Sequence, residues 1–176
     1  FLKKYSLPPV HTPVMFLRMR PGNFPSIRLA QLAAFVQETA GIFSDFLEAE
    51  NLDLISAQLN VTANDYWHYH YMLDESSAFR KKRLGKEMTD HIVINTIVPI
   101  VFAYGIQYKN ELFKARAIRW LEETSAESNT IIHGFTKLGL NCKQAYDTQA
   151  MIELKTKYCD TRRCLQCSVG NALLKI

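Results

Sequence analysis

Apolar side chains recur at helical spacing along most of the chain. Pro25 suits the first turn of a helix, and Ile27, Leu32 and Val36 lie on one broad apolar face, which predicts a helix over 25–39. The same spacing predicts further helices over 42–49, 51–59, 86–104, 108–123, 125–139 and 143–157. The sequence therefore predicts an all-α fold, an array or bundle of six to seven helices with an extended N-terminal arm.

The first residues have a different pattern. Pro8, Pro9 and Pro13 favour an extended lead-in, and PVMFLRMR (13–20) alternates in a way that suits a short strand or an extended arm. We therefore expect residues 1–22 to be an arm or linker, and residues 23–176 to form a single helical domain that ends in a cysteine-rich segment.

The longest apolar run is IVINTIVPIVFAYGI (92–106). It is too short to span a bilayer and it contains Asn95 and Pro99, so we interpret it as a buried core helix that ends near Gly105. Pro99 is expected to kink this helix or to remove one hydrogen bond, and Asn95 is expected to be a buried amide with a partner. If the run were exposed, it could instead form a dimer interface.

Composition and charge set broad limits on function. The chain has 176 residues, of which 48% are hydrophobic, enough for one sizeable core. The net charge of +4 permits an anionic partner without requiring one. The chain starts at Phe1 rather than Met and has no apolar signal segment there, so we expect a processed or partial chain in the cytoplasm, with no membrane partner.

Basic residues gather in three clusters. The first is Arg18, Arg20 and Arg28, the second is Arg80, Lys81, Lys82, Arg83 and Lys86, and the third is Lys155, Lys157, Arg162 and Arg163. Nucleic-acid-binding proteins combine such cations with aromatic faces, and four aromatic residues lie shortly before the second cluster: Tyr66, Trp67, Tyr69 and Tyr71. We take Arg18, Arg20, Arg28, Arg80, Lys81, Lys82 and Arg83 as candidate contacts to nucleic acid or to a partner domain. The alternative is that the second cluster is a solvated loop and that the aromatic residues belong to the core.

The segment YCDTRRCLQC (158–167) contains three cysteines, Cys159, Cys164 and Cys167. The C-x2-C spacing of the last two suits zinc or an iron–sulfur cluster, and the first is close enough to supply a third thiolate. The fourth ligand is the difficulty, because the helix predicted between Cys142 and Cys159 puts these thiols at opposite ends. A histidine is the other option, and the choices are His11, His68, His70, His91 and His133. Packing as small apolar side chains, or pairing as a redox couple, are the alternatives.

Other polar groups suggest little chemistry. His68 and His70 would point to the same side on a strand but not on a helix, so we interpret them as surface or core-edge residues rather than metal ligands. Glu122, Glu123 and Glu127 suggest a solvated face at a helix end. The sequence contains no nucleophile elbow, HExxH motif or glycine-rich phosphate loop. It therefore gives no catalytic residues, and whether the protein is an enzyme is left open.

Several stretches resemble a known bacterial family, the domain-of-unknown-function family 2851. They are LRMRPGNFPSIRLAQLA (17–33), YWHYHYML (66–73), INTIVPIVFAYG (94–105) and QAYDTQAMIELKTKYCDTRRCLQCSVGNALLK (144–175). The resemblance implies that the chain is the C-terminal half of a longer protein. Its missing N-terminal half, with motifs similar to those of nuclease folds, would then be a partner. No catalytic residue of this chain follows from the resemblance.

The sequence is therefore most consistent with a non-catalytic helical accessory domain of a larger bacterial protein, which could help to engage nucleic acid. A zinc, iron–sulfur or thiol-redox domain based on the cysteines is the first alternative. A structural dimerisation unit is the second.

Overall fold

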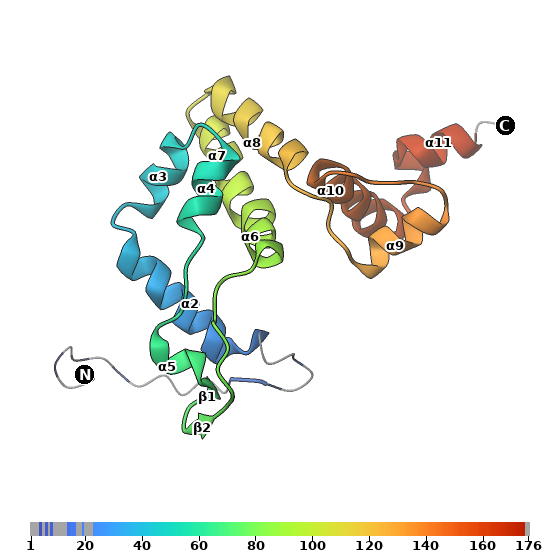
Figure 1. Cartoon of the computed structure of the whole chain (residues 1–176). Coiled ribbons are helices and arrows are strands. Elements are labelled where there is room, and N and C mark those ends of the chain that lie inside the picture. Colours follow the sequence, from blue (N-terminus) through green and yellow to red (C-terminus); the bar gives the residue numbers. More distant parts are fainter. Residues whose placement is uncertain are drawn as a thin grey trace. The chain divides into compact units, whose positions relative to one another are not determined.

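The computed structural model describes residues 23–174 and, before them, only residues 4, 6, 8, 14–16 and 19. Within these residues the chain is mostly helical, as predicted (Figure 1). It forms two compact units. Unit 1 comprises the described residues up to Ala40 together with Asn60–Leu84, and unit 2 comprises Gly41–Leu59 together with the described chain from Gly85 onward. The boundary expected at residue 22 does not separate these units, and the single domain expected over 23–176 stays a prediction.

Unit 1 is built on helix α2 (Pro25–Glu38), which begins at the predicted proline. The short helix α5 (Asp65–His68) leads into a hairpin of β1 (His70–Met72) and β2 (Glu75–Ser76). Two polar bonds fix α2 to the rest of the unit: Ser26 Oγ donates to Tyr71 O at 2.5 Å, and Gln31 Nε2 donates to Lys82 O at 3.3 Å. Of the predicted N-terminal arm, the described residues 14–16 lie in neither a helix nor a strand.

The segment that follows β2 is extended and paired. Its end runs antiparallel to residues 61–63, with Ala63 N donating to Lys82 O at 3.0 Å and Leu84 N donating to Val61 O at 2.9 Å. Thr62 and Arg83 lie opposite each other in this bridge. Residues 80–83 of the basic cluster therefore lie on a segment that is fixed by backbone pairing and drawn in green between β2 and α6 in Figure 1, and Lys86 begins α6.

Unit 2 contains the remaining helices. They are α3 (Ile42–Glu48), α4 (Leu52–Gln58), α6 (Lys86–Ile92), α7 (Val98–Gln107), α8 (Glu111–Glu123), α9 (Thr130–Lys137), α10 (Ala145–Glu153) and α11 (Ser168–Leu174), with π-helical turns at Val93–Ile97 (η2) and Leu154–Cys159 (η3) and a 3-10 turn at Cys164–Gln166 (η4). Val101 on α7 and Trp120 on α8 are fully buried in its core. Arg116 on α8 donates to Leu47 O and Ala49 O at 2.7 and 2.9 Å, so it satisfies carbonyls at the end of α3.

The sequence predicted that this helix ends near Gly105, but Gly105 lies within the helix. Helix α7 continues to Gln107, and a Cβ atom at Gly105 would lie 2.7 Å from Lys114 Cγ and 3.0 Å from Asn110 O. The glycine is needed because α8 begins so close to α7. Its small size, not its backbone freedom, explains its place in the sequence.

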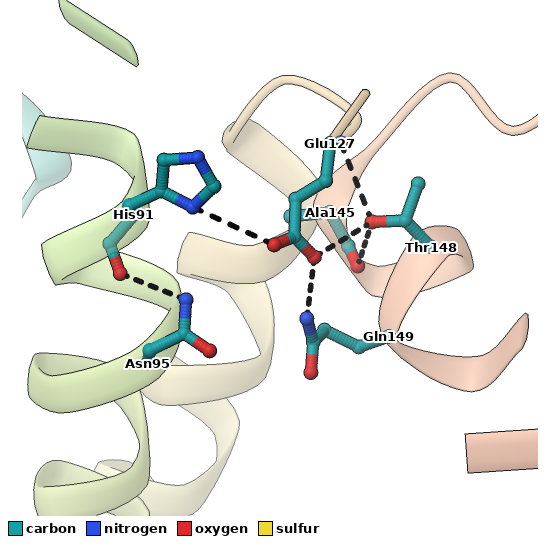
Figure 2. Close-up of polar contacts among 6 residues, drawn as sticks. All are labelled: His91, Asn95, Glu127, Ala145, Thr148 and Gln149. Carbon is teal, nitrogen blue, oxygen red and sulfur yellow. Dashed lines mark hydrogen bonds and ion pairs between the residues drawn. The ribbon is translucent and has the colours of Figure 1, made fainter. Parts of the chain in front are cut away.

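Asn95 is exposed, so the prediction of a buried amide is wrong. Val93 and Ile97 are buried, and Asn95 lies between them on the opposite side of the helix, where its Nδ2 donates to His91 O at 3.0 Å (Figure 2). The helix widens here: Val98 N donates to Val93 O, a π-type bond just before Pro99, which has no N–H to donate.

The continuous helical stretch Lys86–Gln107 has 22 residues and is long and apolar enough to cross a membrane by length and composition alone. Core helices of soluble proteins pass the same test. In this structure the face that carries Val93, Ile97 and Val101 is buried within unit 2.

The start of α9 also differs from the prediction. The sequence predicted a helix from residue 125, but the helix begins at Thr130, and Asn129 is the cap, with its Oδ1 accepting from Ile132 N at 3.0 Å. Ser125 instead pairs with Gln144 in an isolated bridge.

Candidate functional site

The first predicted basic cluster is only partly described. Arg18 and Arg20 lie outside the described residues. Arg28, on α2, is engaged inside unit 1: its Nη1 donates to Gln31 Oε1 at 2.9 Å and its Nη2 to Asn23 Oδ1 at 2.5 Å. Burial lowers the pKa of its guanidinium by desolvation. These bonds give Arg28 a structural role that the sequence pattern did not reveal.

Lys82 is buried, unlike its neighbours in the second cluster. Only 4% of the residue is exposed, and its Nζ lies 3.6 Å from the centre of the Tyr71 ring and donates to Arg80 O at 3.3 Å. The ring face and the carbonyl together stabilise the ammonium group. Lys82 is therefore packed inside unit 1 and does not add to its surface charge.

Four cations of the cluster remain on the surface: Arg80, Lys81 and Arg83 in unit 1, and Lys86 at the start of α6 in unit 2. From Lys81 to Leu84 the chain pairs with residues 61–63, and its side chains alternate between the two sides, whereas Phe79 and Arg80 are both exposed. Lys82 and Leu84 face inward, and Lys81 and Arg83 face solvent. Arg83 Nε also donates to Asn60 Oδ1, which fixes the guanidinium beside the strand.

Two exposed aromatic rings adjoin these cations. Phe79, two residues before Lys81, is 61% exposed, and Tyr69 is 51% exposed. Their ring centres lie 5.2 Å apart in a tilted arrangement. Backbone bonds from Ser77 N to Tyr69 O (2.6 Å) and from Arg80 N to His68 O (2.8 Å) hold the two segments together. We call Tyr69, Phe79, Arg80, Lys81 and Arg83 the basic–aromatic face.

The sequence contained a sign of this face. In FRKKR, the residues Phe79, Lys81 and Arg83 have the period of two that is typical of one side of a strand. We instead counted the five cations as one cluster, and so did not separate Lys82 from Lys81.

The two histidines beside this face pack against different aromatic rings. His68 is at the end of α5 and its ring meets the Phe79 ring edge-on, with centres 5.6 Å apart. His70 begins β1, stacks on Tyr66 at 4.0 Å and has its Nδ1 2.7 Å from Tyr66 O. Each ring is thus packed separately, in agreement with the core-edge interpretation.

All four cysteines are free thiols. Cys159 and Cys164 are exposed, and Cys167 is buried. The helical stretch from Ala145 to Cys159 is unbroken, so Cys142 lies beyond its opposite end, as the sequence predicted. Over residues 23–174 and the few described before them, no three His, Cys, Asp or Glu side chains are grouped so that they could hold a metal ion. The proposed Cys159, Cys164 and Cys167 metal site stays a prediction.

A second polar cluster, in unit 2, centres on Glu127. Its side chain is only 9% exposed, so the prediction of a solvated face is wrong for this residue. Figure 2 shows its carboxylate between two helices: Oε2 accepts from Gln149 Nε2 at 2.5 Å and from Thr148 Oγ1 at 3.4 Å, and Oε1 lies 3.7 Å from His91 Nδ1. Glu127 therefore connects α6 to the first turns of α10.

The Glu127 cluster borders a small pocket of about 150 Å³. Two of the carboxylates that line it have partners: Glu127 lies beside His91, and Asp90 Oδ2 lies 2.6 Å from Lys86 Nζ. We therefore interpret the cluster as a polar brace between helices. The basic–aromatic face is the stronger candidate for binding.

Comparison with known families agrees with the sequence resemblance. A model of the family described as "Protein of unknown function (DUF2851)" matches residues 1–130. The match includes three of the four stretches on which the resemblance was based, and the fourth, 144–175, lies outside it. No curated protein and no solved structure gives a significant match. With about three quarters of its length matched, the chain belongs to the DUF2851 family.

Proposed function

We propose that this protein is a non-catalytic accessory module that binds nucleic acid through the basic–aromatic face of unit 1. The observation that carries this proposal is the burial pattern along FRKKR, in which Lys82 faces inward while Phe79 and the cations Arg80, Lys81 and Arg83 are exposed. Cations at regular intervals on an extended segment match the regular charges of a phosphate backbone.

Local charge supports the proposal better than the net charge of the chain does. Residues 76–84 carry three exposed cations, Arg80, Lys81 and Arg83, and contain no Asp or Glu. Arg83 is held by Asn60, and a guanidinium has further N–H donors that can bind phosphate oxygens. Less side-chain freedom is lost on binding when the donor is already fixed.

The test is the salt dependence of binding. Fluorescence anisotropy with a short labelled oligonucleotide gives the dissociation constant at several salt concentrations. Three exposed cations predict a slope of log K against log salt of about −2 to −3. Lys81→Glu is expected to weaken binding by about tenfold or more, because it replaces a phosphate contact with a repulsive charge.

Lys143→Glu is the matched control, since Lys143 is also exposed but belongs to unit 2. It makes the same change in net charge, so it measures the general electrostatic effect. Equal losses from both variants, or no measurable binding at low salt by the unmodified protein, would contradict the proposal.

A further inference from the structure

The two exposed rings of the basic–aromatic face add information that the cations do not. Phosphate contacts do not distinguish single from double strands, because both carry phosphates. Aromatic side chains do distinguish them, because they stack on unpaired bases. Phe79 is 61% exposed and Tyr69 is 51% exposed, although their ring centres lie only 5.2 Å apart. Two exposed rings beside three cations match a ligand that carries both negative charge and flat apolar groups.

We infer that the ligand is a single-stranded nucleic acid, whose bases stack on Phe79 and Tyr69 while its phosphates bind Lys81 and Arg83. This inference rests on the proposed function and narrows it to one substrate class. In a duplex the faces of the bases are covered by neighbouring base pairs, so a ring at the protein surface can stack only on an unstacked base.

The geometry of the strand fits a stretched chain of nucleotides. Side chains two residues apart on an extended segment are about 6.6 Å apart, so Lys81 and Arg83, which alternate with buried Lys82 and Leu84, lie about that far apart on one line. Phe79, beside Tyr69, precedes this line along the chain.

The face is also set in place before any ligand binds. The bond from Arg80 N to His68 O fixes the chain next to Phe79, and the bond from Arg83 Nε to Asn60 Oδ1 fixes the other end. His68, with a side chain only 12% exposed, supports the Phe79 ring from below through an edge-on contact at 5.6 Å. Such preorganisation favours affinity, because fewer groups must be ordered on binding.

The experiment compares three labelled probes of equal length by anisotropy at low salt: oligothymidylate, an abasic strand with the same phosphates, and a duplex. Oligouridylate is measured beside them to distinguish RNA from DNA. Stacking of one base predicts that Phe79→Ala weakens oligothymidylate binding by about tenfold, within a range of about five- to 100-fold, and changes abasic binding less than about twofold. Phe79→Tyr, which keeps the ring, should retain most of the affinity.

Phe43→Ala is the control for loss of an exposed ring. Phe43 is 51% exposed and meets Tyr104 edge-on at 5.9 Å, but it lies on α3, whose charged residues are acidic. It should leave binding of every probe unchanged.

Two results would overturn the inference while leaving the proposed function intact: equal loss of thymidylate and abasic binding in Phe79→Ala, or duplex binding as tight as single-strand binding. In both cases Lys81→Glu would still weaken binding by about tenfold or more. Absence of binding by any probe would overturn both. Tighter binding of either single strand than of the duplex supports the inference.

Discussion

Lys81 and Lys82 are adjacent, and the structure predicts opposite outcomes for the same substitution at each. Lys81 is exposed on the basic–aromatic face, whereas Lys82 is buried against Tyr71. Replacing a lysine by methionine removes the charge and keeps a side chain of similar length. Lys81→Met should therefore weaken nucleic-acid binding, and Lys82→Met should not.

The size of the Lys81 effect follows from counterion release. One phosphate contact to a single strand contributes about 0.7 to the slope of log K against log salt. Its loss should reduce affinity about fivefold at 0.1 M salt and about 15-fold at 0.02 M salt. The slope itself should become less steep by about 0.7.

For Lys82 the relevant quantity is stability. Lys82→Met loses a cation–π contact of about 0.5–2 kcal/mol and a long hydrogen bond to Arg80 O, worth about 1 kcal/mol at most. It also removes the desolvation cost of a buried ammonium group, which amounts to several kcal/mol. These terms nearly cancel, so the free energy of unfolding should change by no more than about 1 kcal/mol, as measured by urea unfolding followed by circular dichroism.

Anisotropy titrations of both variants at two salt concentrations give the test. If Lys82→Met lost as much affinity as Lys81→Met while remaining folded, the ammonium of Lys82 would face the ligand. The alternation on which the basic–aromatic face depends would then be wrong.

Three further predictions concern unit 2. Arg116→Met should lower the free energy of unfolding by about 2–4 kcal/mol, because two charge-assisted bonds to the end of α3 are lost; Arg116→Lys should recover part of this in the same urea assay. Gly105→Ala should destabilise by about 1–2 kcal/mol, since its Cβ would meet the backbone of α8; stabilisation would mean that α8 can shift. Cys159 and Cys164 should react with Ellman's reagent in the folded protein, and Cys167 only after unfolding; three protected thiols with bound zinc would instead support the metal hypothesis.

Local periodicity was sufficient to find most helices. The prediction of 25–39 corresponds to Pro25–Glu38 in α2, and 42–49 to Ile42–Glu48 in α3. In these segments the apolar spacing and the boundary residues act within one or two turns, so the sequence alone contains the relevant information.

The errors arose where distant residues decide the outcome. The burial of Lys82 depends on Tyr71 and on Gln31, which bonds its carbonyl from 51 residues away. The exposure of Asn95 depends on which face of its helix the rest of unit 2 covers. A window of sequence shows that a run is apolar, but not that one of its faces is left in water.

The extent of the family match bears on which candidate site carries a shared function. The DUF2851 model covers residues 1–130, which include Tyr69, Phe79 and the three exposed cations but end before α10 and the cysteine segment. A function common to the family must depend on residues that the family model describes. The cysteines lie outside it, so a thiol or metal function would be a property of chains with this C-terminal segment. The basic–aromatic face lies within the matched region, and is therefore the part of this chain whose function other family members could share.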